Sequence, residues 1–141
     1  MRTERDVEAY LEASGRRYEP VKDRPGLYLV TGAHDIQTAV RVEAPLVVAR
    51  VHIGELPTAG DLAPLLRKLL EHNAGTLIHT SFGLDGTSIV LAAALPLENL
   101  DRNELEAILD EIDMSLARDV PALRSLTASI HPPAAAAGAK S

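Results

Sequence analysis

Residues 72–90, HNAGTLIHTSFGLDGTSIV, bring two histidines, three glycines, an aspartate and several hydroxyl groups into one short segment. Such residues could serve nucleophilic catalysis or phosphate binding. However, Ser81 and Ser88 do not stand in the G-x-S-x-G turn that exposes a nucleophilic serine. The glycines of residues 83–86, GLDG, lack the spacing and the lysine of phosphate-binding loops. The segment therefore favours an architectural role over catalysis.

A metal site would need ligands at a usable spacing, such as two histidines one helical turn apart with a glutamate between them. The sequence contains no such pattern. His72 is predicted on the outer face of a helix, and His52 and His79 alternate with polar residues on strands, which favours surface positions. The chain also has no cysteine, which excludes disulfides, thiolate catalysis and cysteine-based zinc sites.

We therefore expect no metal, no cofactor and no enzymatic activity. Two alternatives stay open at this point. One is a metal pair formed by His52 and His79 across a sheet. The other is an enzyme that uses His52, His79 and Asp85.

The composition indicates one cytoplasmic domain with an aliphatic core. The chain has 141 residues, of which 46% are hydrophobic, with three tyrosines, one phenylalanine and no tryptophan. Its charged N-terminus lacks the apolar segment of a secretion signal, and no apolar run is long enough to span a membrane. We expect residues 1–130 to form a single domain and residues 131–141, HPPAAAAGAKS, to be disordered.

The net charge of −6 opposes direct binding of nucleic acid, because such binding depends on lysine and arginine neutralising the phosphates. The basic cluster GRRYEP sets Arg16 and Arg17 beside Tyr18, but acidic residues flank it. A nucleic-acid surface needs a longer stripe of such groups. We interpret the cluster as a solvated loop.

The hydrophobic pattern predicts an α+β fold with the order α-βββ-α-ββ-α, an antiparallel sheet packed by helices. The first helix is capped by Thr3 and ends at Gly15. Residues 27–54 are predicted to form a three-stranded meander. Its middle strand alternates, with one set of side chains facing one side (Ile36, Thr38, Val40 and Val42) and another facing the opposite side (Gln37, Arg41 and Glu43).

The second helix is predicted over residues 61–73, where the period changes to that of a helix. Asp61 is its candidate cap, Pro64 is tolerated in the first turn, and Asn73 is interpreted as a cap at the helix end. Its leucines cover a stripe wider than one contact with a sheet requires. These leucines are Leu62, Leu65, Leu66, Leu69 and Leu70.

A hairpin and a third helix complete the predicted fold. TLIHTSF (residues 76–82) and TSIVLAAAL (residues 87–95) are predicted strands, joined by a type I′ turn at Asp85-Gly86. The last helix begins at Asp101, with Glu104 completing a capping box. Its apolar face comprises Leu105, Ile108, Leu109, Ile112 and Leu116, and its solvated acidic positions are drawn from Glu104, Glu106, Asp110, Glu111 and Asp113. Pro121 is expected to start or kink a last segment that carries Leu123, Leu126 and Ile130.

In residues 3–118 the sequence resembles the YbjN-like family, whose fold is similar to that of class I type III secretion chaperones of the CesT type. The most telling stretch is LLRKLLEHNAGTLIHTSFGLDGTSIVLAAALPLENLDRNELEAIL. Within it, Leu69, Leu70 and Asn73 match the family's leucine-rich helix that ends in asparagine. Phe82 to Gly86 match its hairpin, and Leu95-Pro96-Leu97 with Leu100 match the exit into the last helix.

The resemblance implies a non-catalytic, dimeric adaptor that holds a segment of a partner protein. The five leucines of the second helix are the candidate dimer interface, because a second surface would cover the excess leucines. Val7, Tyr10 and Leu11 on the first helix are the candidate partner-binding residues. The alternative function is a regulatory domain that binds a small molecule in a hydrophobic groove between sheet and helices.

Overall fold

A computed structural model describes residues 2–130 and has three helices and a six-stranded antiparallel sheet. The order along the chain is α1 (Glu4–Ala13), β1 (Tyr18–Pro20), β2 (Leu27–Thr31), β3 (Gln37–Glu43), β4 (Leu46–Glu55), α2 (Ala63–Gly75), β5 (Ser81–Asp85), β6 (Ser88–Pro96) and α3 (Arg102–Ile130), with a short 3-10 turn, η1 (Ala33–Asp35). The predicted fold class is confirmed. The predicted tail, residues 131–141, lies outside the described residues.

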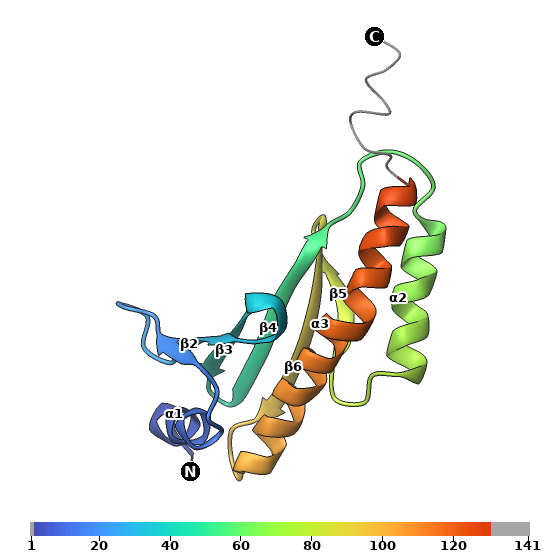
Figure 1. Cartoon of the computed structure of the whole chain (residues 1–141). Coiled ribbons are helices and arrows are strands. Elements are labelled where there is room, and N and C mark those ends of the chain that lie inside the picture. Colours follow the sequence, from blue (N-terminus) through green and yellow to red (C-terminus); the bar gives the residue numbers. More distant parts are fainter. Residues whose placement is uncertain (1, 131–141) are drawn as a thin grey trace.

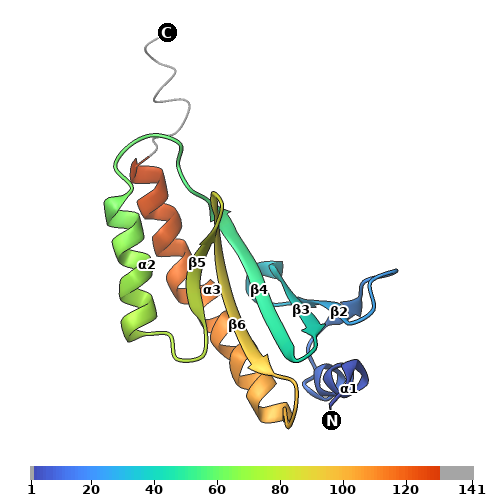
Figure 2. The same cartoon turned by 180° about the vertical axis from the view of Figure 1, so that it is seen from behind.

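The strands follow the order β1-β2-β3-β4-β6-β5 across the sheet, so β1 and β5 are its edges. The helix α3 lies along one face of the sheet, α2 lies beside α3 next to β5, and α1 lies at the opposite end (Figure 1). Seen from behind, the other face of the sheet carries no helix formed by residues 2–130 (Figure 2). The core therefore forms on one side of the sheet only.

The sheet contributes to this core the side chains that occupy every second position along its strands. In β3, Thr38 and Val40 are buried while Gln37, Arg41 and Glu43 are exposed, as predicted. Val47, Ala49 and Val51 of β4 and Leu91 of β6 are buried on the same side. Side chains of one face recur every second residue in a strand, so the residues between them line the open face.

The predicted caps at the starts of α1 and α3 are present, whereas Asp61 is not the cap of α2, because Leu62 holds that position and Asp61 instead accepts from the Ala63 N–H (3.0 Å). The Thr3 backbone N–H donates to Asp6 (2.7 Å) in a capping box at α1. At α3, the Asp101 N–H donates to Glu104 and the Glu104 N–H donates to Asp101 (3.1 and 2.8 Å). The whole predicted apolar face of α3 is buried.

The region around Arg16 differs from the predicted solvated loop. The Arg16 guanidinium is largely buried and bridges Asp110 and Asp113 of α3. Tyr18 belongs to β1, a strand that the sequence prediction missed, and its hydroxyl donates to Glu12 (2.9 Å). The arginine packs because α3 presents two carboxylates to it, a contact across more than 90 residues of chain.

Pro121 does not start a new segment. The helix α3 continues through it to Ile130, and Val120 and Leu123 on either side of it are buried. Leu126 and Ile130 are half-buried against the same core. The apolar stripe thus continues past the proline, and its packing outweighs the cost of one lost hydrogen bond.

The predicted hairpin is present, but its first strand and its turn are shifted. The strand β5 begins at Ser81, and residues 76–80 form a loop in which the amide groups of residues 78–80 bond to Glu111 instead of to a strand. Asp85 pairs with Ser88, so Gly86 and Thr87 are the two turn residues. Gly86 has a φ of 61° and Thr87 is not among the residues of positive φ, a pattern of type II′ and not type I′.

Replacing Gly86 by valine is expected to lower the free energy of unfolding by about 1 to 3 kcal/mol, because a β-branched residue resists positive φ. Gly54→Val is the matched control, because Gly54 lies in a strand with open space around its Cα and an ordinary φ. Urea unfolding of both variants measures the difference. Equal stabilities would refute the role of backbone strain at this turn.

Candidate protein-binding surfaces

The structure divides the five leucines predicted for the second helix between the core and the surface. Leu62 is the residue that precedes α2, and the other four lie within α2. Leu65 and Leu69 are buried, whereas Leu62 and Leu66 are half-buried and Leu70 is 67% exposed. Leu62, Leu66 and Leu70 are four residues apart, so they form one row along the helix. Leu65 and Leu69 are therefore part of the core. Of the five leucines, only the row of Leu62, Leu66 and Leu70, the outer row, is available to a second molecule.

The outer row of α2 borders a groove against the edge strand β5. The groove has a volume of about 240 Å³ and is almost entirely apolar in its lining. Leu84 of β5 is 48% exposed on its far wall. We refer to these residues as the α2–β5 surface: Leu66, Leu69, Leu70, Asn73, Phe82, Gly83 and Leu84.

Asn73 joins the two walls of this groove. Its Nδ2 donates to the Phe82 carbonyl oxygen (3.0 Å), and the Phe82 N–H donates to its Oδ1 (2.7 Å). Asn73 lies within α2, which ends at Gly75, so the interpretation as a helix cap is wrong. The amide instead occupies both main-chain groups that Phe82 presents at the sheet edge. Because outward-facing groups alternate along an antiparallel edge, Leu84 also directs its N–H and C=O outward.

Glu111 of α3 fixes the loop that leads into β5. Its carboxylate accepts hydrogen bonds from the backbone N–H groups of Ile78, His79 and Thr80 (3.1, 3.0 and 2.8 Å) and from the Thr80 hydroxyl (2.6 Å). Burial on its own raises the pKa of Glu111, but these donors outweigh it and lower the pKa below its ordinary value. Glu111 and Asp113 are thus structural anchors and not solvated positions, since Asp113 also accepts from the Ala33 N–H.

A polar cluster lies between α2 and α3. Asp119 is buried and accepts hydrogen bonds from Arg118 Nε (2.8 Å) and Ser115 Oγ (3.0 Å). His72 Nδ1 lies 3.8 Å from Asp119 Oδ1, and the His72 ring packs against Phe82. The prediction that His72 lies on the outer face of α2 is therefore wrong. The helix turns this side chain toward α3, where only 12% of it is exposed.

The cluster contains Ser, His and Asp, but its geometry does not match a nucleophilic triad. Ser115 donates to Asp119 and not to the histidine, and it is fully buried. A triad needs the serine hydrogen-bonded to the histidine and open to substrate. Burial raises the pKa of Asp119, and the hydrogen bonds from Arg118 and Ser115 reverse this, so its pKa lies below the ordinary value.

We expect the free energy of unfolding to fall when the pH is lowered through about 4. The pKa values of Glu111 and Asp119 are depressed in the folded state, from ordinary values of 4.5 and 3.8. Their ionised forms therefore stabilise the fold above those values, and the stabilisation is lost as pH falls through the lowered ones. Urea midpoints measured from neutral pH to pH 3 would show the fall, and Glu111→Gln should flatten it. A flat profile for the native chain would contradict the assignment.

Two residues of the open catalytic alternative, His52 and Asp85, are engaged in surface pairs, whereas His79 is exposed in the loop before β5 and not on a strand as predicted. His52 Nε2 lies 2.7 Å from Glu55 Oε2, and Asp85 pairs with Arg50. Hydrogen bonds from Ser88, His52 and Thr87 lower the pKa of Glu55 to about 2.

Within residues 2–130, no three His, Asp or Glu side chains are grouped to hold a metal ion. None of the helices in the described part of the chain is long and apolar enough to cross a membrane.

The candidate partner-binding residues of α1 are placed in the core. Val7 and Leu11 are fully buried, and Tyr10 is half-buried with its hydroxyl donating to the Leu100 carbonyl oxygen (3.2 Å). The apolar face of a short amphipathic helix is what the domain buries first, which explains the outcome. In this conformation these side chains are not a surface for a partner.

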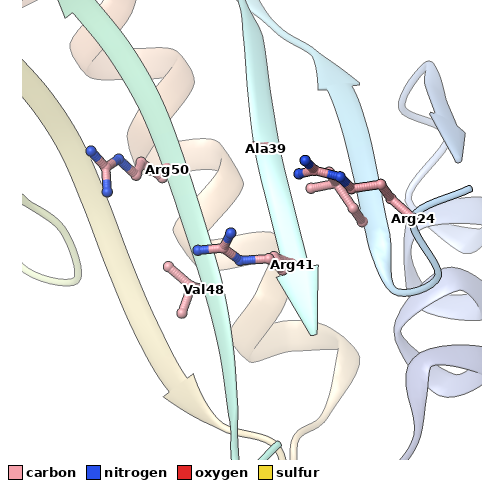
Figure 3. A pocket seen from close by; sticks show the side chains of 6 residues that line it. Arg24, Ala39, Arg41, Val48 and Arg50 are labelled. Carbon is pink, nitrogen blue, oxygen red and sulfur yellow. The ribbon is translucent and has the colours of Figure 1, made fainter. Parts of the chain in front are cut away.

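A second surface, which the sequence prediction missed, lies on the open face of the sheet. Figure 3 shows Arg24, Arg41 and Arg50 projecting around Ala39 and Val48. We refer to it as the arginine surface, a hollow of about 280 Å³ lined by Arg24, Leu27, Ala39, Arg41, Val48 and Arg50. The sequence signal for it was one outward-facing arginine in each of β3 and β4, Arg41 and Arg50, and that signal is common on exposed strands.

Comparison with known proteins gives one family and several similar folds. The profile of the CesT_Tir_1 family matches residues 1–129. A chain of the heterodimeric complex ExoU–SpcU from the type III secretion system of Pseudomonas aeruginosa is similar in structure, with a TM-score of 0.64, 18% identity, and coverage of 82% of this chain and 95% of that chain. No curated protein matches in sequence.

Two further structures share the fold. YbjN from E. coli, described as a putative transcription regulator, gives a TM-score of 0.61 at 12% identity, over 79% of this chain and 86% of that one. The Yersinia pestis type III secretion chaperone SycH, in complex with a fragment of YscM2, gives 0.55 at 16% identity, over 85% and 98%. The predicted resemblance to YbjN and to type III secretion chaperones is thereby confirmed at the level of the fold.

Proposed function

The chain belongs to the CesT_Tir_1 family, and from that membership we propose that it is a non-catalytic, homodimeric adaptor that binds a segment of a partner protein. The observation that carries the proposal is the α2–β5 surface, where Leu70 and Leu84 are exposed beside an apolar groove. Apolar surface of this kind is a liability for a monomer and marks an interaction site.

Self-association is the use of this surface that we favour. A row of leucines along a helix, next to a sheet edge with outward main-chain groups, can be self-complementary about a two-fold axis. Two of the similar structures, ExoU–SpcU and SycH with YscM2, are complexes between two proteins, which supports a partner for this chain as well.

Capture from the native cell tests the adaptor function. The tagged chain should enrich one protein in near-stoichiometric amount, and the two purified proteins should re-form the complex when mixed. An unrelated tagged protein of similar net charge is the control. Failure to re-form any complex from purified components would count against the adaptor function.

The small-molecule alternative makes a different prediction. A metabolite that binds the folded state raises the melting temperature by mass action, whereas an adaptor for protein segments does not respond to a metabolite library. We expect no reproducible shift. A saturable shift abolished by Leu70→Glu would instead assign the groove to a small molecule.

A further inference from the structure

The charged side chains that line the arginine surface are cationic, although the whole chain is acidic. The net charge is −6, yet every charged side chain that lines this hollow is an arginine. Its floor is aliphatic, formed by the half-buried Leu27, Ala39 and Val48. A cationic rim around an apolar floor is complementary to an anionic group with apolar neighbours.

The three arginines retain free donors. Arg41 Nε contacts Glu43 Oε2 (3.2 Å), and Arg50 uses Nη2 toward Asp85. No carboxylate among residues 2–130 pairs with Arg24. A guanidinium has five N–H donors, so each of the three can still receive a carboxylate from another molecule.

The register fixes the spacing of two of them. Arg41 lies opposite Val48, and Arg50 lies opposite Ala39, so the two arginines are diagonal neighbours on adjacent strands. Such neighbours are about 7 to 8 Å apart. In an extended chain, side chains two residues apart on one face are separated by about 6.5 Å. Two acidic residues separated by one residue therefore match Arg41 and Arg50.

We infer that the arginine surface holds an extended acidic segment of a partner protein, whose apolar side chains contact Leu27 and Val48 and whose carboxylates pair with Arg24, Arg41 and Arg50. The inference rests on the proposed adaptor function and names the chemistry of the partner. Nucleic acid is disfavoured as the occupant, because three cations on a chain of charge −6 give few phosphate contacts.

A fluorescent peptide of alternating glutamate and valine is the probe, measured by anisotropy at low ionic strength, where surface charges are least screened. Arg24→Glu and Arg41→Glu should each weaken binding at least about tenfold. Both residues are exposed, so the fold should tolerate the change, and circular dichroism checks this. Arg124→Glu is the matched control, an exposed arginine on α3, and should leave binding within about twofold.

The inference is overturned if the peptide does not bind, if the control variant weakens it equally, or if a peptide of alternating lysine and valine binds as well. Stronger binding of a single-stranded oligonucleotide, or full displacement by inorganic phosphate, would also overturn it. Partner capture and the mass of the native chain do not involve this peptide. A failed peptide with a captured partner would therefore reject this inference and leave the adaptor function standing.

Discussion

Replacing Leu70 by glutamate is expected to give a folded monomer. Leu70 is 67% exposed, so a charge there does not disturb the core of the single chain. In a dimer across the α2–β5 surface, the same carboxylate would be buried without a partner, which costs several kcal/mol. The dimer should weaken by about a hundredfold or more. Light scattering coupled to gel filtration measures the mass, and circular dichroism confirms that the chain is folded.

Met114→Glu is the matched control for this change. Met114 is also an exposed apolar residue on a helix, but it lies on α3 and does not line the groove of the α2–β5 surface. It should leave the mass unchanged. Leu69→Glu is not a usable test, because Leu69 is buried and the variant would fail to fold. A Leu70→Glu protein with the mass of the native assembly would refute this interface.

Glu111→Gln is expected to destabilise the fold by about 1.5 to 3 kcal/mol, the range for hydrogen bonds to a charged group. In the variant, the glutamine N–H₂ group faces backbone N–H donors that bond to a carboxylate oxygen in the native chain. The glutamine oxygen can still accept from the buried Thr80, so the loss comes from the missing charge and from the N–H₂ group that faces the Ile78 and His79 amides in place of Oε2. Urea unfolding at neutral pH measures the loss.

Glu106→Gln provides the comparison on the same helix. Glu106 pairs with Arg102 one turn earlier (3.0 Å), an ion pair near the surface. Such pairs contribute little, so this variant should lose less than about 0.5 kcal/mol. If the two variants were equally stable, the carboxylate of Glu111 would not be what holds residues 78–80.

Local rules were sufficient for the elements whose signals lie within a few residues. The capping box of Asp101 and Glu104, the alternation around Val40 and the positive φ of Gly86 each depend on neighbours in the sequence. These features gave the fold class before the structure was known. The type of the hairpin turn was wrong, because moving the turn by one residue changes which positions need positive φ.

Long-range contacts account for the rest. Glu111 bonds to a loop more than 30 residues away, and Arg16 to carboxylates more than 90 residues away. In the sequence alone, these side chains are indistinguishable from ordinary solvated charges. Asn73 likewise pairs with a strand edge that exists only after β5 and α2 dock. Polar residues whose partners come from another element carry no local pattern.

The exposed leucines of the candidate binding surface could not be identified from the sequence for the same reason. The sequence indicated too many leucines for one contact, and the structure assigns Leu65 and Leu69 to the core and Leu70 to the surface. Which row faces inward depends on how α2 docks beside α3 and β5, and an apolar stripe does not specify this. The arginine surface also depends on strand register, which sets Arg41 beside Arg50.

The mass of the native chain in solution tests the central claim most directly. Light scattering coupled to gel filtration, across concentrations from below to well above micromolar, gives this mass without reference to any ligand. A homodimeric adaptor predicts the mass of two chains, with dissociation only at the lowest concentrations. The mass of a single chain throughout this range would contradict the dimer, and the exposed leucines of the α2–β5 surface would then require another occupant.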